Sequence, residues 1–141
     1  MITEMQIQEN KDTFINLVSS IERYGANIDG LINWLTNSDF FVAPASHKYH
    51  GSYKGGLCQH SLNVYNNLKR LVEDFGMESI IDEDTCKIVA LLHDLSKVNF
   101  YKVDYRNKKV YSEKGSKKDE LGRFDWVSEK CYRYLEDNER F

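Results

Sequence analysis

Apolar residues recur at three- and four-residue steps through the first two thirds of the chain, and this spacing predicts helices. The first lies within residues 4–24 and ends near Gly25, and the second covers residues 28–35. A third begins near Leu57 and continues to about Phe75. Its apolar stripe consists of Leu57, His60, Val64, Leu68 and Leu71.

A fourth helix is predicted after the break at Gly76. Residues 82–84 give it an acidic first turn, which is favourable at a helix N-terminus. Its apolar positions are Ile88, Val89, Leu91, Leu92 and Leu95. We therefore expect His93 and Asp94 to stand side by side on an apolar helix.

Residues 39–56 show no helical period, hold the only proline and include three glycines, so we expect a loop. A long loop within a compact domain is usually functional or disordered. This one carries polar and aromatic side chains, which favours a loop that lines a polar pocket. They are His47, Lys48, Tyr49, His50, Tyr53 and Lys54. Gly55 and Gly56 would let the backbone come close to whatever fills that pocket.

The last third of the chain is predicted to begin with β-structure. Residues 100–111 alternate β-forming side chains around an Asn-containing turn, which is typical of a β-hairpin. Residues 114–118 form a charged loop, and the apolar spacing over 121–135 predicts a last helix. The expected fold class is therefore mainly α: a single domain over residues 1–141, built as a helical bundle with a small β-hairpin after the His-Asp helix.

The composition fits one domain with a sizeable core, because the 141 residues are 41% hydrophobic and 13% aromatic. The start of the chain has no basic region followed by an apolar run, and no apolar stretch approaches the roughly 20 residues needed to span a bilayer. We therefore expect a cytoplasmic protein with no membrane partner. Cys58, Cys86 and Cys131 lie far apart and are expected to be reduced thiols.

The net charge of −3 conceals an uneven distribution. Between Lys97 and Lys118, eight Lys or Arg residues face only Asp104 and Glu113. Such a segment is either a surface that attracts phosphate or a solvated loop, and the sequence leaves both interpretations open.

The histidines and the His-Asp doublet are the residues in which metal chemistry is expected. Imidazole nitrogen and carboxylate oxygen suit divalent cations. His60 on a buried stripe could be a core histidine, but the doublet on a second buried helix favours a ligand. An ionised Asp94 among apolar residues needs a compensating cation. We therefore predict one divalent metal ion (Mn, Fe, Ni, Zn or Mg) held by His60, His93 and Asp94.

Several runs of the sequence resemble the HD-domain metal-dependent phosphohydrolases. The runs are Phe41-Val42-Ala43-Pro44-Ala45-Ser46, Tyr53-Lys54-Gly55-Gly56-Leu57, His60-Ser61-Leu62 and Leu91-Leu92-His93-Asp94-Leu95-Ser96-Lys97-Val98, with His50 before the second. They look most like the HD domain of bacterial 3′–5′ exoribonucleases, over residues 40–125. The resemblance implies an HD-like helical fold, a metal at His60, His93 and Asp94, and hydrolysis of a phosphate ester or nucleotide.

Two departures from the resembled enzymes lie after the doublet. A histidine follows a Leu-Gly pair in those enzymes, whereas Arg123 follows Leu121-Gly122 here. Their last aspartate ligand comes from a late helix, typically farther beyond the doublet than the 47 residues that follow it here. Three explanations stay open: a truncated form, an incomplete site, or a fourth ligand recruited from Asp104, Asp119 or Asp125. We expect at most one metal per chain.

We predict roles in the hydrolysis of a phosphate ester for six polar residues, of which Asp94 is also a predicted metal ligand. Asp94, Lys97 and His50 are the predicted catalytic residues, with His50 donating to the leaving oxygen. Lys54, Lys97, Arg123 and His47 are predicted to bind the substrate. The expected partner is a phosphate-containing small molecule or a nucleic-acid end. The alternatives are an HD-like nucleotide- or protein-binding module without turnover, and a helical interaction protein whose histidines are structural.

Overall fold

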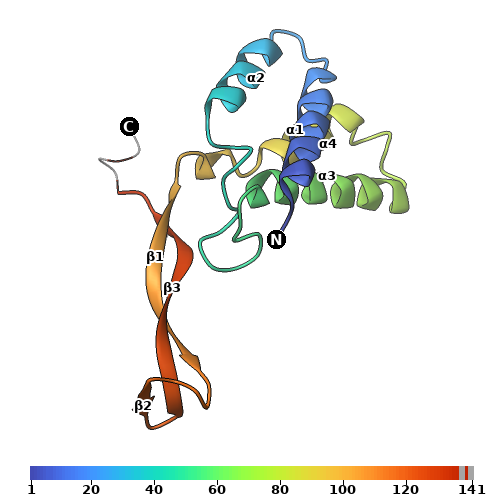
Figure 1. The fold of residues 1–141 in the computed structure, drawn as a ribbon. Coiled ribbons are helices and arrows are strands. Elements are labelled where there is room, and N and C mark those ends of the chain that lie inside the picture. Colours follow the sequence, from blue (N-terminus) through green and yellow to red (C-terminus); the bar gives the residue numbers. More distant parts are fainter. Residues whose placement is uncertain (137–138, 140–141) are drawn as a thin grey trace.

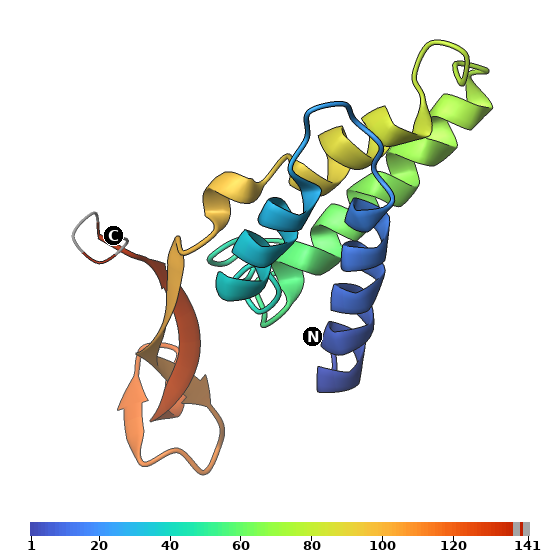
Figure 2. The same ribbon diagram turned by 90° about the horizontal axis from the view of Figure 1, so that it is seen from above.

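The computed structural model describes residues 1–136 and 139, with four α-helices, one 3₁₀ turn and three strands (Figure 1). In chain order these are α1 (Glu4–Ser19), α2 (Ile28–Asn37), α3 (Gly56–Asp74), α4 (Glu83–Leu92), η1 (Leu95–Lys97), β1 (Tyr101–Tyr111), β2 (Lys117–Asp119) and β3 (Gly122–Tyr134). The helices form one body, and the strands form a ribbon that extends away from it (Figures 1 and 2). No helix in the described residues is long and apolar enough to cross a membrane.

Local capping fixes where the helices begin. Thr3 and Gln6 form a capping box at α1: Thr3 Oγ1 accepts from the Gln6 amide at 3.1 Å, and Gln6 Oε1 accepts from the Thr3 amide at 2.8 Å. The Asp82 side chain accepts from the Thr85 amide at 2.7 Å and caps α4. α1 ends at Ser19, five residues before the predicted end.

The hydrophobic core lies between the four helices and the loop before α3. Its fully buried large side chains include Phe14 of α1, Leu35 of α2, Leu57 of α3 and Leu91 of α4. Phe40 of the loop packs against Phe14 with ring centroids 4.7 Å apart. The helical periodicity of the sequence identified the faces of α1 and α2 that meet in this core. On α3 and α4 it was partly wrong, because Leu71 and Val89 of the predicted stripes are exposed.

Helix α4 ends earlier than its apolar pattern predicts. The helix stops at Leu92, His93 is its C-cap, and Asp94 precedes the 3₁₀ turn. The expectation that Asp94 is embedded in an apolar helix was wrong. The doublet instead lies where the helix gives way to a tighter turn, and this directs the two side chains toward the N-terminal part of α3.

Residues 38–55 contain no helix or strand, as predicted, and fold back on themselves. The Ala45 amide donates to the Gly51 carbonyl at 2.9 Å, and the Leu57 amide donates to the Ala43 carbonyl at 3.0 Å. A Cβ on Gly56 would lie 2.0 Å from the Gly51 carbonyl oxygen. Gly56 is therefore required for close packing of the loop on its own backbone. The expected role, a close approach of this backbone to whatever fills the pocket, is not what the contact shows.

The C-terminal third differs from its prediction in two elements. Residues 101–111 form one continuous strand, because Asn107 pairs with Ser128 and does not make a turn. The predicted helix over 121–135 is the strand β3, antiparallel to β1 from Tyr101↔Tyr134 to Tyr111↔Phe124. The sheet order is β1-β3-β2. The chain therefore combines four helices with a small three-stranded antiparallel sheet, and the mainly-α expectation holds only for residues before 100.

Candidate metal centre

His60, His93 and Asp94 meet where the N-terminal part of α3 packs against the end of α4. The apolar face of α3 holds Leu57, Cys58, Ser61 and Leu62 in the core, and His60 lies at the margin of that face with its side chain partly exposed. His93 and Asp94 reach the same place from the end of α4. Thirty-three positions separate His60 from His93, so only packing of the two helices brings them together.

The three side chains are spaced as ligands of one ion would be. Asp94 Oδ2 lies 3.4 Å from His60 Nε2 and 3.2 Å from His93 Nε2. All three candidate ligand atoms lie within 4.8 Å of one another. Ligand atoms about 2.1 Å from one ion in tetrahedral geometry lie about 3.4 Å apart. The distances therefore suit a single cation bound by two imidazoles and a carboxylate.

The tautomer of His93 also suits a metal. His93 Nδ1 lies 2.7 Å from the Ala90 carbonyl oxygen, which can only accept, so Nδ1 must carry the proton. In the neutral ring Nε2 then carries a lone pair, and this nitrogen faces Asp94 Oδ2. Two electron-rich atoms 3.2 Å apart repel unless a proton or a metal cation lies between them. A backbone bond to the far nitrogen is also a usual way to orient a ligating histidine.

The surroundings of His60 favour its neutral, metal-binding form. Burial lowers the pKa of His60, the Asp94 charge acts in the opposite direction, and His50, His93 and Lys97 lower the pKa further. The rings of His60 and His93 have centroids 5.2 Å apart. A neutral His60 ring can donate its lone pair to a metal.

Two predicted catalytic residues lie beside the cluster. Lys97 Nζ lies 3.3 Å from Asp94 Oδ2 and donates to the Ala45 carbonyl at 2.8 Å. The His50 ring lies 4.9 Å from the His60 ring, centroid to centroid. Lys97 thus joins the cluster to the loop, and the loop holds His50 at its edge.

The base of the ribbon, where β1 begins at Tyr101 and β3 ends at Tyr134, adds residues to the site that were not predicted from the sequence. Tyr101 is buried, and burial together with the Tyr134 and Asp94 charges raises its pKa. The Tyr134 hydroxyl lies 2.9 Å from His47 Nδ1. The sequence placed Tyr101 in the predicted β-structure directly after the doublet. Tyr134 itself could not be found, because its segment was interpreted as a helix.

Other predicted residues lie away from the cluster. Lys54 pairs with Glu4 at 2.9 Å. Arg123 of β3 lies opposite Lys118 of β2, and its guanidinium donates to the Gly115 carbonyl at 3.3 Å. Strand β2 lies at the end of the ribbon remote from the helices (Figure 1). In the described residues Asp104, Asp119 and Asp125 do not reach the cluster; their partners are Arg133, Lys109 with Tyr111, and Ser116 respectively.

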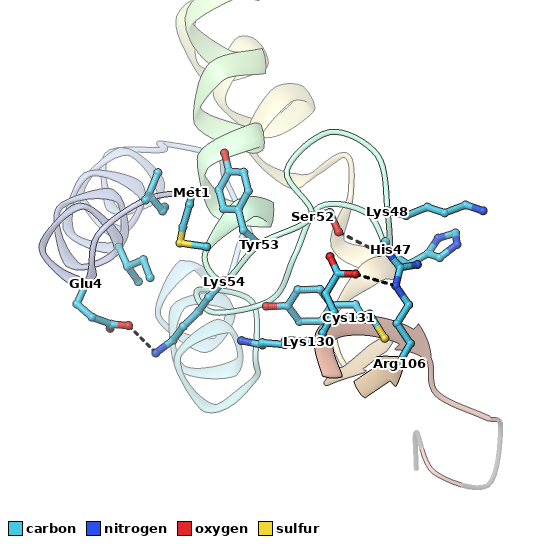
Figure 3. Close-up of a pocket in the computed structure, with 14 residues that line it drawn as sticks. Met1, Glu4, His47, Lys48, Ser52, Tyr53, Lys54, Arg106, Lys130 and Cys131 are labelled. Carbon is cyan, nitrogen blue, oxygen red and sulfur yellow. Dashed lines mark hydrogen bonds and ion pairs between the residues drawn. The ribbon is translucent and has the colours of Figure 1, made fainter. Parts of the chain in front are cut away.

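A cavity of about 500 Å³ lies on the other side of residues 46–54, between this loop, the start of α1 and the strands (Figure 3). His47, Lys48 and Lys54 line it from the loop, and Arg106 and Lys130 line it from the ribbon. None of His50, His60, His93, Asp94 or Lys97 lines it. The loop therefore has two functional sides: His50 lies at the cluster, and the cationic side chains lie at the cavity.

Comparison with known families agrees with this geometry. A family model described as the HD domain matches residues 57–139, which is more than half of the chain and includes His60, His93 and Asp94. The chain belongs to the HD-domain family, which places it in a superfamily of metal-dependent phosphohydrolases. Searches of curated proteins and of solved structures gave no significant match.

Proposed function

We propose that this protein is a metal-dependent phosphohydrolase that cleaves a phosphate ester of a nucleotide or a phosphodiester. The observation that carries the proposal is the convergence of His60, His93 and Asp94, each of which offers one ligand atom within 4.8 Å of the others. The resemblance of the same segments to the HD domain of bacterial 3′–5′ exoribonucleases supports a phosphodiester as the bond cleaved. We propose one divalent ion per chain.

The side chains around the cluster have distinct roles in this proposal. A divalent cation, when bound, polarises a phosphoryl oxygen and acidifies water. Lys97 stabilises negative charge that develops on the phosphate, because its ammonium is fixed by the Ala45 carbonyl beside Asp94. His50, which belongs to the loop, supplies a proton to the leaving oxygen. Tyr101 and Tyr134 close the side of the site where the ribbon begins.

A second candidate function is a binding module that holds a nucleotide or protein without turnover. The specific observation in its favour is that the described residues bring only three ligand side chains together. The three carboxylates that could have supplied a fourth are engaged along the ribbon. Three protein ligands leave positions open for water and substrate, so the same observation is compatible with catalysis.

Two measurements on untagged protein test the proposal. Elemental analysis after purification gives the metal content per chain, and hydrolysis of bis(p-nitrophenyl) phosphate with added Mn²⁺ or EDTA gives the turnover. We expect about one metal per chain and EDTA-sensitive hydrolysis. Metal without hydrolysis of this or of a nucleotide substrate would favour the binding module. Absence of any bound divalent metal would contradict the phosphohydrolase.

A further inference from the structure

The register of β1 and β3 divides the ribbon into two chemically different faces. Residues directly opposite each other in an antiparallel pair share a face, and successive residues alternate between faces. The aromatic face comprises alternate residues from Tyr101 to Tyr111 and from Phe124 to Tyr134. The opposite face comprises the residues between them. Every aromatic side chain of the two strands lies on the aromatic face.

The opposite face neutralises its own charges. Arg133 pairs with Asp104 at 3.1 Å, and Arg106 pairs with Glu129 at 3.4 Å. Lys108 lies 4.0 Å from the same glutamate. Cations that already have carboxylate partners gain little from an added phosphate, so this face is not built to attract a polyanion.

The aromatic face instead leaves its rings open to solvent. Tyr105 is 66% exposed and Trp126 is 50% exposed, whereas Phe124 is buried between its neighbours. Lys109 lies over the Phe124 ring at 4.5 Å and pairs with Asp119, so its charge is already compensated. Exposed rings at intervals along a strand have no role in a core, and they offer surfaces on which flat groups can stack.

The cavity shown in Figure 3 lies beside the ribbon and is lined by residues of both its faces. Lys130 lies opposite Tyr105 on this face and also lines the cavity with Lys48 and Lys54. Figure 3 shows the Lys54 side chain extending from the loop toward Glu4 and the Lys130 side chain extending from the ribbon. In the described residues Lys54 pairs with Glu4, but no carboxylate pairs with Lys48 or Lys130. The cavity wall therefore keeps two uncompensated positive charges.

The base of the aromatic face adjoins the metal centre. Tyr101 and Tyr134, the pair at its end, have ring centroids 5.5 Å apart, and the nearby Asp94 charge contributes to the raised pKa of Tyr101. A chain lying along this face would therefore approach His60, His93 and Asp94 at one end.

We propose that the aromatic face of the ribbon, with Lys130 and Lys48 of the adjoining cavity, binds single-stranded nucleic acid. Stacking on exposed rings combined with cations for the backbone is how proteins bind single strands without sequence preference. Eleven β residues span about 36 Å, the length of roughly ten stacked nucleotides. A duplex keeps its bases stacked inside and cannot use the rings. The proposal rests on the proposed function in naming the substrate class of the same centre.

Binding is tested without metal, so that its failure is separable from failure of hydrolysis. Full-length protein in EDTA at low salt is titrated against a fluorescein-labelled oligothymidylate or oligouridylate of about twelve nucleotides, and anisotropy is recorded. Thymidine monophosphate and a duplex of the same length serve as competitors. We expect the single strand to bind, and both competitors to displace it poorly.

Matched variants locate the binding face. Tyr105→Ala, at a mostly exposed position, should weaken binding by at least about fivefold. Lys130→Gln should weaken it a few-fold and make the salt dependence shallower, whereas Lys108→Gln on the opposite face should change it by less than about twofold. Circular dichroism confirms that each variant is folded.

Three outcomes would overturn the proposal. One is the absence of binding to either oligonucleotide, which would point to a protein partner for the exposed rings. Another is equal affinity for duplex and single strand. The third is an equal loss of affinity for the oligonucleotide in Lys108→Gln and Lys130→Gln, with the affinity of Tyr105→Ala unchanged. That pattern would mean unspecific attraction to a basic surface.

Discussion

Along the four helices, Phe14, Leu35, Leu57 and Leu91 are fully buried, whereas the apolar side chains of the strands include only two buried ones, Tyr101 and Phe124. The helical body is stabilised by burial of apolar surface in one core. The ribbon is stabilised by cross-strand hydrogen bonds, ion pairs and ring contacts, which are individually weak. The candidate ligands are held in place by packing of the helical body, and the exposed rings lie on the ribbon.

This difference indicates a division of roles. Ligands held on packed helices keep their spacing, which a metal centre requires. An exposed ribbon of two long strands has little core of its own and is suited to contact a partner. The following predictions compare the two regions, beginning with the largest expected effect.

Asp94→Asn should remove the bound metal and reduce hydrolysis by more than about a hundredfold, because a neutral amide is a poor substitute for the ligating carboxylate. The control is Asp104→Asn on the ribbon, where the carboxylate pairs only with Arg133 in the described residues. Metal content by elemental analysis and initial rates check both variants. Equal metal loss in the control would contradict the assignment of the centre to the helical body.

Leu91→Ala should lower the free energy of unfolding by about 2 to 5 kcal/mol, because it leaves a cavity in the core. Val110→Ala on the ribbon, where the side chain is largely exposed, should change it by about 0.5 kcal/mol or less. Urea unfolding followed by circular dichroism at 222 nm, the usual wavelength for helix content, measures both. Similar losses would show that the ribbon is as tightly packed as the helices.

Lys97→Ala should leave the metal in place and lower kcat about ten- to a hundredfold, since it removes a positive charge beside the reacting phosphate but no ligand. The comparison is Lys54→Ala, where the ammonium pairs with Glu4 at the cavity. Its expected effect falls on KM. If Lys97→Ala emptied the metal centre as completely as Asp94→Asn, its proposed role would be wrong.

The end of the ribbon should loosen in acid before the helical body unfolds. Hydrogen bonds from Lys109 and Tyr111 lower the pKa of Asp119 from 3.8 to about 2. Because the folded pKa is depressed, these bonds stabilise the sheet above about pH 4 and are lost as the pH falls toward about 2. Trp126 fluorescence in a Trp34→Phe background reports the change. Asp119→Asn should remove this pH dependence, and an unchanged transition would assign it to another group.

Much of the helical body was determined locally by the sequence. Apolar residues at helical spacing located all four helices and identified the buried faces of α1 and α2, because each helix buries one stripe against the others. The faces of α3 and α4 were only partly identified, since Leu71 and Val89 of their predicted stripes are exposed. The polar segment with Pro44 and its glycines identified the loop. The His-Asp doublet and His60 identified the candidate ligands, although the premise that Asp94 is embedded in an apolar helix was wrong.

The ribbon could not be predicted in the same way. Alternation of polar and apolar residues arises when one face of a strand is covered, and both faces of β3 are largely open. Phe124, Val127 and Tyr134 therefore followed a helical spacing by chance. A signal was present in the aromatic and β-branched residues between Gly122 and Tyr134, but it favoured a strand only once β1 was available as a partner.

Tertiary structure alone decided three features of the candidate site. The end of α4 at Leu92 turned Asp94 out of the helix, toward His60 and Lys97. The folding of the loop on itself separated His50, at the cluster, from Lys48 and Lys54, at the cavity. The pairing of β1 with β3 brought Tyr134 to His47 across 87 positions. Each depends on contacts between residues distant in sequence, whereas periodicity and motifs report only on neighbours.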